Sequence, residues 1–383
     1  LEYTLGRVPI GSTDFSTREY SYDDVADDFN LRHFALRADD YRYKIKFIKM
    51  AQKVSPNKIR LVASPWSSPA WMKTNQRMSG GGALRDDYRV HRAYANYFVR
   101  FFEEYDKEGV DFWGVTIENE PTAGAVPNYK WQSLFFTATT ERDFVRDYLG
   151  PTMKSHLLTA NISIICLDDN RIWLPIWADI MFEDEKVEGY VDGIGVHWYG
   201  NGLYPAHLLT TTHQRHPNKF ILATEACAGS SFPHGPILGD WYRAEQYAYD
   251  IITDLNNFVT GWMDWNLCLN MDGGPTWVKN YVDSPIIINS TANEFYKQPM
   301  FYAMGHFSKF IKPGSRRILS KVQTTNKNLQ ITAAVNKGQR VLVILNQSDE
   351  EEEIFVEDAM KRNVHLNLVV PARSISTVIW NKK

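Results

Sequence analysis

The chain has 383 residues, enough for about two domains whose cores need no disulfide or metal for stability. Its 42 Lys and Arg residues against 45 Asp and Glu residues exclude the basic field that nucleic-acid binding requires, and a hydrophobic content of 44% excludes a disordered chain. The three cysteines are too few for a disulfide framework, and no apolar run reaches the ~18 residues of a membrane span.

Short apolar runs rich in β-branched residues predict a series of strands. They lie at 3–10, 59–64, 112–117, 162–167, 191–197, 219–223 and 259–263. Amphipathic stretches between them predict helices at 41–54, 141–156, 173–182 and 241–255. An aromatic stripe at helical spacing predicts one more helix, with the stripe packed in the core. Its members are Tyr94, Tyr97, Phe98, Phe101, Phe102 and Tyr105. Strands that alternate with helices indicate βαβ units and a parallel sheet.

The pattern changes at 312–314 (Lys-Pro-Gly), after which the sequence predicts only strands and turns. Residues 336–338 (Asn-Lys-Gly) predict a hairpin loop, and the acidic run 349–353 predicts a solvated turn. Apolar residues alternate with polar ones, as in half-buried strands, at Val364, Leu366 and Leu368 and again at Ile375, Thr377 and Ile379. We therefore expect an α/β barrel domain over 1–311 and an antiparallel β module over 312–383.

The chemistry of a parallel β/α barrel gathers on the loops that follow the C-terminal ends of the strands. Glu120 follows the third predicted strand, and Glu225 follows the sixth, about three βαβ repeats later. In an eight-stranded barrel this spacing places them nearly opposite each other across one cleft. Two facing carboxylates are what glycoside hydrolysis requires: one protonates the leaving oxygen, and the other attacks the anomeric carbon or activates water. The alternative is that each carboxylate belongs to a salt-bridge network.

The residues around these carboxylates favour a carbohydrate site. Asn119 is placed to donate a hydrogen bond to a sugar 2-hydroxyl. Strand-end aromatic residues offer apolar faces for a pyranose ring at Trp66, Trp198, Tyr199 and Trp265. We interpret Glu118 as the structural partner of a cation. We expect His197 to bond to Glu225 or to substrate, since no second histidine stands at metal-binding spacing. Cys227 is expected to be a small buried thiol.

A series of short motifs runs along the whole chain in a fixed order. They are Arg7-Val8-Pro9, Asp14-Phe15-Ser16, Ala63-Ser64-Pro65-Trp66, Glu118-Asn119-Glu120-Pro121, Val196-His197-Trp198-Tyr199, Glu225-Ala226-Cys227, Asp264-Trp265-Asn266, Val282-Asp283-Ser284-Pro285-Ile286-Ile287, Tyr296-Lys297-Gln298-Pro299-Met300-Phe301-Tyr302 and Gly305-His306-Phe307-Ser308-Lys309-Phe310-Ile311. Together they resemble glycoside hydrolase family 30 and, within it, the lysosomal glucosylceramidases.

The resemblance implies roles for individual residues. It makes Glu120 the acid/base and Glu225 the nucleophile of a retaining reaction that passes through a covalent glucosyl–enzyme intermediate, with ~5–5.5 Å between the two carboxyl groups. It places glucose-binding residues at Asp14, Trp66, Asn119, Trp265 and Asn280. It places residues that line the cleft entrance or orient the nucleophile at Tyr129, Trp131, His197 and Tyr199.

The resemblance also implies a (β/α)8 barrel with a β-sandwich built from both termini, working without a cofactor or a metal. It implies hydrolysis of glucosylceramide to glucose and ceramide, at membrane surfaces in acidic lysosomes, aided by a saposin-type activator and anionic lipids. Sequons at Asn161, Asn289 and Asn346 permit glycosylation on a secretory route.

The family begins well before Leu1, so we expect its first barrel strand and the N-terminal strands of its β module to have no counterpart here. The expected fold is a TIM-type barrel that lacks its first strand and has two open edges, followed by an incomplete β-sandwich. Because an open barrel could impair catalysis, a second hypothesis is a catalytically impaired relative that binds glycolipid or a partner protein. A third is an enzyme for other β-linked sugars, such as xylans, which the wider family also cleaves.

Overall fold

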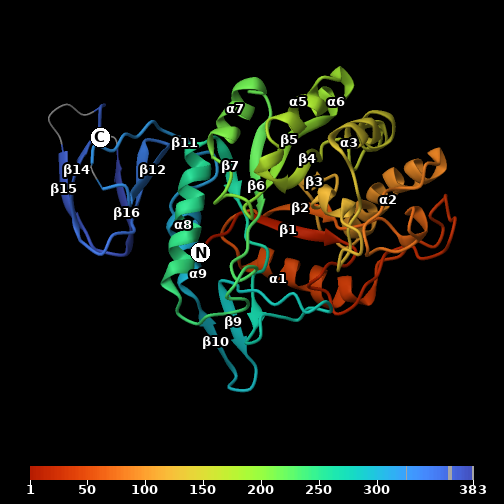
Figure 1. The fold of residues 1–383 in the computed structure, drawn as a ribbon, viewed down its shortest axis with the longest axis horizontal. Helices are drawn as coiled ribbons and strands as arrows, with labels where there is room; N and C mark the ends of the chain where they lie inside the picture. Colours follow the sequence, from red (N-terminus) through yellow and green to blue (C-terminus); the bar gives the residue numbers. More distant parts are fainter. Residues whose placement is uncertain (325, 361–364, 382–383) are drawn as a thin grey trace.

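The computed structural model describes residues 1–324, 326–360 and 365–381. Its largest sheet has seven strands in chain order, and every neighbouring pair is parallel (Figure 1). The strands are β1 (Leu5–Ile10), β2 (Arg60–Pro65), β3 (Gly114–Thr116), β4 (Ser163–Asn170), β5 (Val191–His197), β6 (Phe220–Glu225) and β7 (Val259–Trp262). This confirms the predicted α/β fold, a TIM-type barrel with seven strands.

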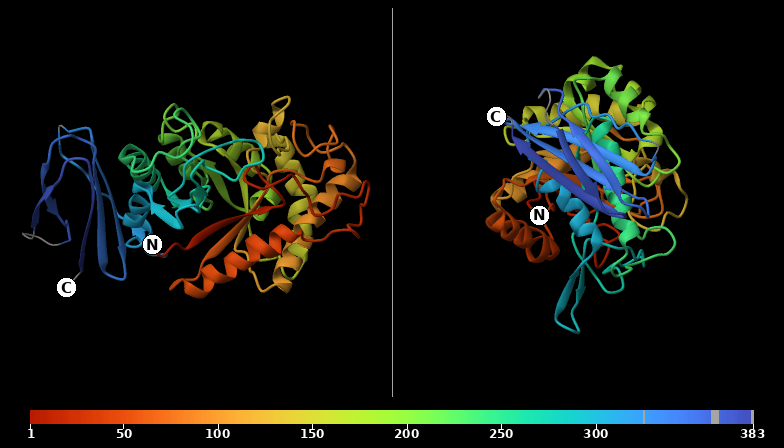
Figure 2. Two further views of the ribbon diagram at one scale, coloured as in Figure 1. Left: turned by 90° about the horizontal axis from the view of Figure 1, so that it is seen from below. Right: turned by 90° about the vertical axis from the view of Figure 1, so that its left-hand side faces the viewer.

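Helices pack along the outer side of this sheet (Figures 1 and 2). They are α1 (Lys46–Val54), α2 (Tyr88–Lys107), α3 (Ala138–Phe144), α4 (Gly150–Ser155), α5 (Ile176–Phe182), α6 (Glu185–Tyr190), α7 (His207–Arg215), α8 (Trp241–Asn256) and α9 (Pro299–Ser308). The helix predicted at 141–156 is confirmed as an unbroken helical stretch from Ala138 to Ser155, which contains a π-helical segment, Val145–Leu149, between α3 and α4. Pro151 has no N–H to donate, which accounts for the irregular turn before it. None of the helices in the described ranges combines the length and apolarity needed to cross a bilayer.

The aromatic stripe lies on α2, as predicted. Asp87 caps the helix by accepting from the N–H of Arg89, and the stripe faces the sheet with each ring at most 2% exposed. The rings of Phe101 and Tyr105 lie 4.4 Å apart, centroid to centroid. The stripe belongs to one buried cluster that also contains residues of β1 to β7, so it stabilises the barrel wall and takes no direct part in the site.

A small sheet beside the barrel was not predicted. It joins β8 (Leu269–Asn270), β9 (Ile286–Asn289) and β10 (Glu294–Lys297), and the β9–β10 hairpin projects from the body of the molecule (Figure 1). The sequence signal was weak because β8 has two residues and the other two strands have four each.

The C-terminal module is all β, as predicted. One sheet holds β11 (Arg316–Arg317), β12 (Leu329–Asn336), β13 (Gln339–Asn346) and β16 (Ser374–Asn381), and a second pairs β14 (Glu352–Glu357) with β15 (His365–Val370). Lys337 and Gly338 form the predicted hairpin loop, both with positive φ. The predicted turn at 349–353 is wrong at its end, because Glu352 already belongs to β14. Val364 lies outside the described residues.

The module packs against the barrel domain through β13. Val341, Val343 and Leu345 share a buried cluster with residues of α8 and α9, among them Tyr247 and Met304. Figure 2 shows the module beside these two helices.

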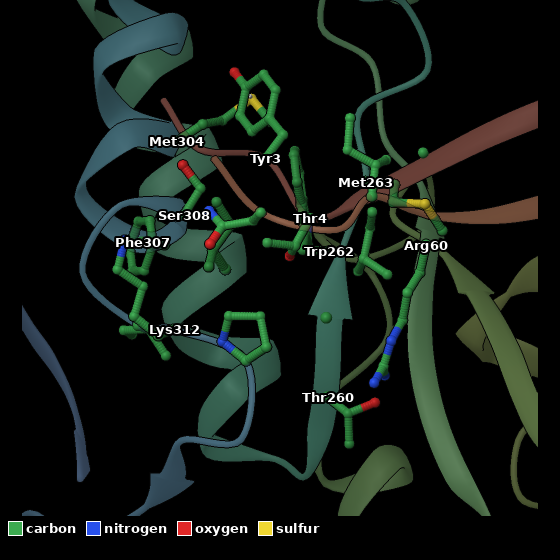
Figure 3. Close-up of a pocket in the computed structure, with 18 of the residues that line it drawn as sticks. Tyr3, Thr4, Arg60, Thr260, Trp262, Met263, Met304, Phe307, Ser308 and Lys312 are labelled. Atoms are coloured by element: carbon green, nitrogen blue, oxygen red, sulfur yellow. Dashed lines mark hydrogen bonds between the residues drawn. The ribbon is translucent and has the colours of Figure 1, made fainter. Parts of the chain in front are cut away.

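β1 and β7 are the edges of the large sheet, since no pairing joins them within the described ranges. Between them lies a cavity of about 1740 Å³, which we call the seam (Figure 3). It opens beside the site, because Arg7 and Trp265 contribute to its wall.

Candidate active site

Glu120 and Glu225 face the same space at the C-terminal ends of β3 and β6. Glu225 is the last residue of β6, and Glu120 stands between β3 and a 3-10 helix with a left-handed backbone, φ 45° and ψ 60°. The Glu120 N–H donates to the carbonyl of Asp168 at 2.9 Å, which ties this turn to β4. One carboxylate oxygen of each glutamate and a ring nitrogen of His197 lie within 4.8 Å of one another.

Arg7, in β1, is the cation that joins these groups. Its Nη1 donates to Glu225 Oε2 at 2.5 Å, while Nη2 donates to Asp168 Oδ2 at 2.6 Å and to Asn119 Oδ1 at 2.8 Å. Its Nε donates to Ser64 Oγ at 3.0 Å. The Arg7 side chain is 3% exposed, so the planar guanidinium is a buried counter-charge that fixes the positions of four side chains from four strands or strand ends.

His197, the last residue of β5, lies between two carboxylates. Its Nδ1 is 3.1 Å from Glu120 Oε1, and its Nε2 is 3.1 Å from Asp168 Oδ1. Burial alone would lower the pKa of His197, but the charge of Glu225 and the bonds to Asp168 and Glu120 raise it to about 10. The ring is therefore an imidazolium that donates from both nitrogens. Of the two predicted partners of His197, Glu225 is wrong, because the ring bonds to Asp168 in β4 and to Glu120 after β3, while a bond to substrate stays a prediction.

Glu225 is held from two sides. Tyr199 donates its hydroxyl to Glu225 Oε1 at 2.7 Å, and Arg7 occupies Oε2. Burial raises the pKa of Glu225, whereas the charges of His197 and Arg7 oppose this rise. Burial would also raise the pKa of Asp168, but Arg7 and the hydrogen bond from His197 hold that pKa below its usual value. Asp168 is therefore ionised and fully buried between two cations.

The residues expected to bind glucose lie next to this cluster. Asn280 donates to Asp14 Oδ2 at 2.8 Å. Burial, together with the charges of Glu225 and Glu120, raises the pKa of Asp14 to about 7 despite this bond. The rings of Trp66 and Trp265 stack 4.7 Å apart, and the Arg7 guanidinium lies 4.7 Å from the Trp66 ring centroid. Trp66 is 2% exposed, so its indole supports Trp265 and offers no free face.

Tyr129 and Trp131 stand together on the loop after the 3-10 helix. Their rings make an edge contact at 4.8 Å, and both side chains are half-buried. Burial and the negative charges of Glu120, Asp14 and Glu225 raise the pKa of Tyr129, so it shares the electrostatic environment of the site.

Two interpretations of residues near the site are wrong. Trp198 lies edge-on against Tyr247 and Trp262, with ring centroids at 5.2 and 6.4 Å, and so packs on α8 instead of offering a face to a sugar. Glu118 makes no ion pair within the described residues; it accepts from the Tyr94 hydroxyl at 3.0 Å, and burial raises its pKa well above the usual value. Cys227 is 1% exposed, as expected of a structural thiol.

Arg7 and Asp168 were missed by the sequence interpretation as members of the site. A signal for Arg7 was present, because a cation inside an apolar strand needs a buried anionic partner. Asp168 carried less signal, since Asp169 follows it and one sequence does not show which of the two points inward. In the structure Asp169 turns toward the Thr122 hydroxyl at 2.6 Å.

The oxygens of Glu120 and Glu225 and the nitrogen of His197 are close enough together to hold a metal ion. A metal needs a neutral imidazole, whereas the pKa of His197 is raised to about 10 by the surrounding carboxylates and their hydrogen bonds. The donor set therefore suits a protonated ring better than a metal, and a reaction without a metal or cofactor stays a prediction.

The chain matches the glycosyl hydrolase family 30 TIM-barrel domain over residues 1–311 and the beta sandwich domain of the same family over residues 314–378. Putative glucosylceramidase 3 of Caenorhabditis elegans is 54% identical over 384 residues, covering 100% of this chain and 73% of that protein. Lysosomal acid glucosylceramidase of Mus musculus is 45% identical over 388 residues, covering 100% of this chain and 74% of that protein. The crystal structure of SrfJ from Salmonella typhimurium superposes with a TM-score of 0.89 at 30% identity, covering 100% of this chain and 82% of that one. Both domains of the family are matched in order along the chain, and the carboxylate cluster lies in the first of them. The chain therefore belongs to glycosyl hydrolase family 30.

Proposed function

We propose that this chain is a retaining β-glucosidase that hydrolyses glucosylceramide to glucose and ceramide. The observation that carries the proposal is the Glu120–Glu225 pair, whose nearest oxygens lie within 4.8 Å of each other. That distance fits the ~5–5.5 Å of retaining enzymes and leaves no room for the water that an inverting enzyme places between carboxylates ~6.5–9.5 Å apart.

The contacts of the two carboxylates suggest different roles. Glu225, bound by Arg7 and Tyr199, is the nucleophile that attacks the anomeric carbon and forms a glucosyl ester. Glu120 gives its proton to the glycosidic oxygen as ceramide leaves, then takes a proton from the water that cleaves the ester. His197 binds Oε1 of Glu120, so we assign Oε2 to the leaving group.

The sugar-binding assignment follows from the polar groups beside the pair. Asp14 and Asn280 would form a polar edge for the sugar hydroxyls, Asn119 would bond to the 2-hydroxyl, and the half-buried Trp265 indole, stacked on Trp66, would pack against the sugar ring. Tyr129 and Trp131 would contact the leaving-group side. The names of the two relatives, both glucosylceramidases, support glucose as the sugar and ceramide as the leaving group.

Exposed apolar side chains on the loops at this end of the barrel suit a lipid substrate. Leu203 follows β5 and is 83% exposed, Phe232 follows β6 and is 91% exposed, and Trp173 follows β4. Such side chains would contact the ceramide tails or a membrane surface. We therefore propose a peripheral, lysosomal protein that works on anionic lipid surfaces with a saposin-type activator. We also propose the division into a catalytic domain, 1–311, and a β-sandwich module, 312–383.

The decisive experiment compares the wild type with Glu225→Gln on an aryl β-glucoside. We expect turnover to vanish in Glu225→Gln, and a mechanism-based covalent glucosidase probe to label Glu225 in the wild type only. Glu351→Gln, an exposed carboxylate in the β module, is the matched control and should keep full activity. Equal rates for wild type and Glu225→Gln would contradict the assignment.

A second variant separates the two roles. Glu120→Gln should lose about 10²–10⁴-fold in kcat on glucosylceramide, which needs an acid to release its alkoxide. It should lose far less on a dinitrophenyl glucoside, because that leaving group departs without protonation. Comparable losses on both substrates would remove Glu120 from the acid role.

The other hypotheses have their own tests. A non-catalytic binder of glycolipid, suggested by the open seam, predicts lipid binding with no probe labelling at all. An enzyme for other β-linked sugars predicts a higher kcat/KM on aryl xylosides or galactosides than on the glucoside.

A further inference from the structure

The three sequons of the chain differ in how much of the asparagine amide is free. An N-linked glycan replaces one of the two hydrogens on the amide nitrogen, and it needs open space in front of that nitrogen. Burial and the number of N–H groups already used in hydrogen bonds therefore rank Asn161, Asn289 and Asn346 as glycan acceptors.

Asn161 has the freest amide of the three. It is exposed on the loop between α4 and β4, and its side chain makes no hydrogen bond with the rest of the described chain. Other groups hold this loop, because the Thr159 hydroxyl donates to the carbonyl of Met153 and Lys154 Nζ donates to the carbonyl of Ala160. A glycan can therefore replace either amide hydrogen of Asn161 without the loss of a contact.

Asn289 uses one of its two N–H groups. It ends β9, in the hairpin that projects from the body of the molecule (Figure 1). Its Nδ2 donates to the Tyr296 hydroxyl at 3.1 Å, and its Oδ1 accepts from the N–H of Ala292 at 3.1 Å. The hairpin tip, residues 290–295, is exposed throughout. A glycan can replace the second amide hydrogen while the bond to Tyr296 is kept.

Asn346 is the contrasting case. It is fully buried, and its Nδ2 donates to the carbonyls of Glu350 at 2.9 Å and Pro371 at 3.0 Å. These bonds use both N–H groups and tie the end of β13 to the segments that precede β14 and follow β15. A glycan would break one of them and would have no space, so a chain modified at Asn346 could not adopt this fold.

We propose that Asn161 and Asn289 carry N-linked glycans, whereas Asn346 keeps a free amide in the folded protein. The donor is an oligosaccharide linked to a lipid through a diphosphate. The Asn Nδ2 forms a bond to the anomeric carbon of the first sugar, the bond from that carbon to the diphosphate breaks, and the amide proton is released as the lipid diphosphate leaves. The inference goes beyond the proposed function and rests only on the secretory route that a lysosomal protein takes.

The two glycans would cover apolar side chains that lie away from the site. Leu157 lies four residues before Asn161 on the same loop and is 96% exposed. Phe295 is 61% exposed and pairs with Ile288, the residue before Asn289. The loop of Asn161 precedes β4, so it stands at the N-terminal ends of the barrel strands, opposite to the end that carries the site. The glycans would thus reduce exposed apolar surface and leave the catalytic end free.

The test expresses the 383-residue chain behind a cleavable signal peptide in a eukaryotic secretory host. Peptide-N-glycosidase in isotopically labelled water converts each glycosylated Asn to a labelled Asp, and mass spectrometry of the peptides measures the occupancy of every sequon. We expect label at Asn161 and Asn289 and none at Asn346. Protein retained in the cells is mapped in the same way after trypsin has removed unfolded chains, so poor secretion does not prevent the measurement.

Variants of the sequon hydroxyls assign each glycan without changing the asparagines. Ser163→Ala and Thr291→Ala should each remove one glycan, seen as a shift on a denaturing gel, whereas Ser348→Ala should remove none. Ser163→Thr and Thr291→Ser keep the hydroxyl and should keep the glycan, which separates loss of the sequon from a folding defect. The double variant Ser163→Ala/Thr291→Ala should scatter light at a lower temperature than the wild type, because Leu157 and Phe295 lose their cover.

Several results would overturn the proposal. A free amide at Asn161 or at Asn289 in the folded protein would remove that residue as a glycan site. A glycan on Asn346 in the folded protein would show that burial and hydrogen bonding do not govern acceptance. Equal scattering by the double variant and the wild type would contradict the covering role. None of these measurements involves glucosidase turnover, so their failure is distinguishable from failure of the proposed function.

Discussion

The site and one end of the seam lie at the C-terminal ends of the same strands, yet their buried carboxylates have opposite surroundings. At the site, Asp168 is bound by Arg7, His197 and the Thr224 hydroxyl. At the seam, neither carboxylate oxygen of Asp264 has a hydrogen bond of ordinary geometry within the described residues. Asp168 lies near the end of β4 and Asp264 lies just after β7, so the two aspartates have similar positions in the fold but different surroundings.

The difference follows from strand pairing. β4 has a partner on each side, and the complete run of strands around it brings the histidine of β5, the threonine of β6 and the arginine of β1 to Asp168. β7 has a partner on one side only, and the side chains that would come from a further strand are absent from the described residues. A barrel thus supplies the partners of a buried carboxylate from several strands, which need not be adjacent to its own.

Replacing Arg7 should have the largest effect. Arg7→Gln leaves Asp168 and Glu225 buried without their cation, which should lower the free energy of unfolding by about 3–5 kcal/mol and abolish glucosidase turnover. Urea unfolding followed by tryptophan fluorescence measures the first effect. Unchanged stability would mean that the ion pairs of Arg7 do not stabilise the fold. The contrast between the paired carboxylates of the site and Asp264 at the seam would then have no energetic meaning.

The two aspartates give a matched pair of variants. Asp168→Asn removes a charge from between two cations and should cost about 3 kcal/mol of stability. Asp264→Asn has the same shape change, but burial raises the pKa of Asp264 well above its usual value, so burial disfavours the charge that this variant removes and little should be lost. We expect a change below about 1 kcal/mol for Asp264→Asn. Equal losses for the two variants would show that Asp264 has a partner after all.

The pH dependence of stability should reveal a buried carboxylate behind the site. Glu141 accepts from the Trp177 indole and the Leu167 N–H, yet burial raises its pKa to about 8 in spite of these bonds. Unfolded, it titrates near ~4.3, so the folded chain retains a proton that the unfolded chain has released. Its contribution is complete below about pH 4 and is lost as the pH rises through about 8, by at most ~1.4 kcal/mol per pH unit.

Glu141→Gln should therefore flatten the decline of stability between pH 5 and pH 7.5. A smaller decline should remain, because the pKa of Asp14 is also raised by burial, to about 7. Denaturant midpoints of both proteins across this range measure the slope. Identical slopes would mean that Glu141 is ionised in the fold.

The sequence allowed the strands of the barrel to be predicted because each is a short apolar run with a turn after it. It also identified the two glutamates as candidate site residues, since the functional side chains of a β/α barrel lie at the C-terminal ends of its strands. It did not reveal which way a ring turns: His197 and Trp198 are neighbours, and the structure directs one to Glu120 and the other to α8. Pairwise contacts such as Arg7 to Glu225 join residues far apart in the chain, and no local pattern encodes them.

The left-handed backbone of Glu120 has a consequence for the tolerance of this position to substitution. A side chain in this conformation costs about 1–2 kcal/mol, a penalty that glycine avoids. Glu120→Gly would relieve this backbone strain, but the His197 ring would lose a carboxylate partner and the proposed reaction would lose its acid. At this position the backbone conformation favours glycine whereas the proposed reaction requires a carboxylate, so the strained glutamate is itself a sign of function.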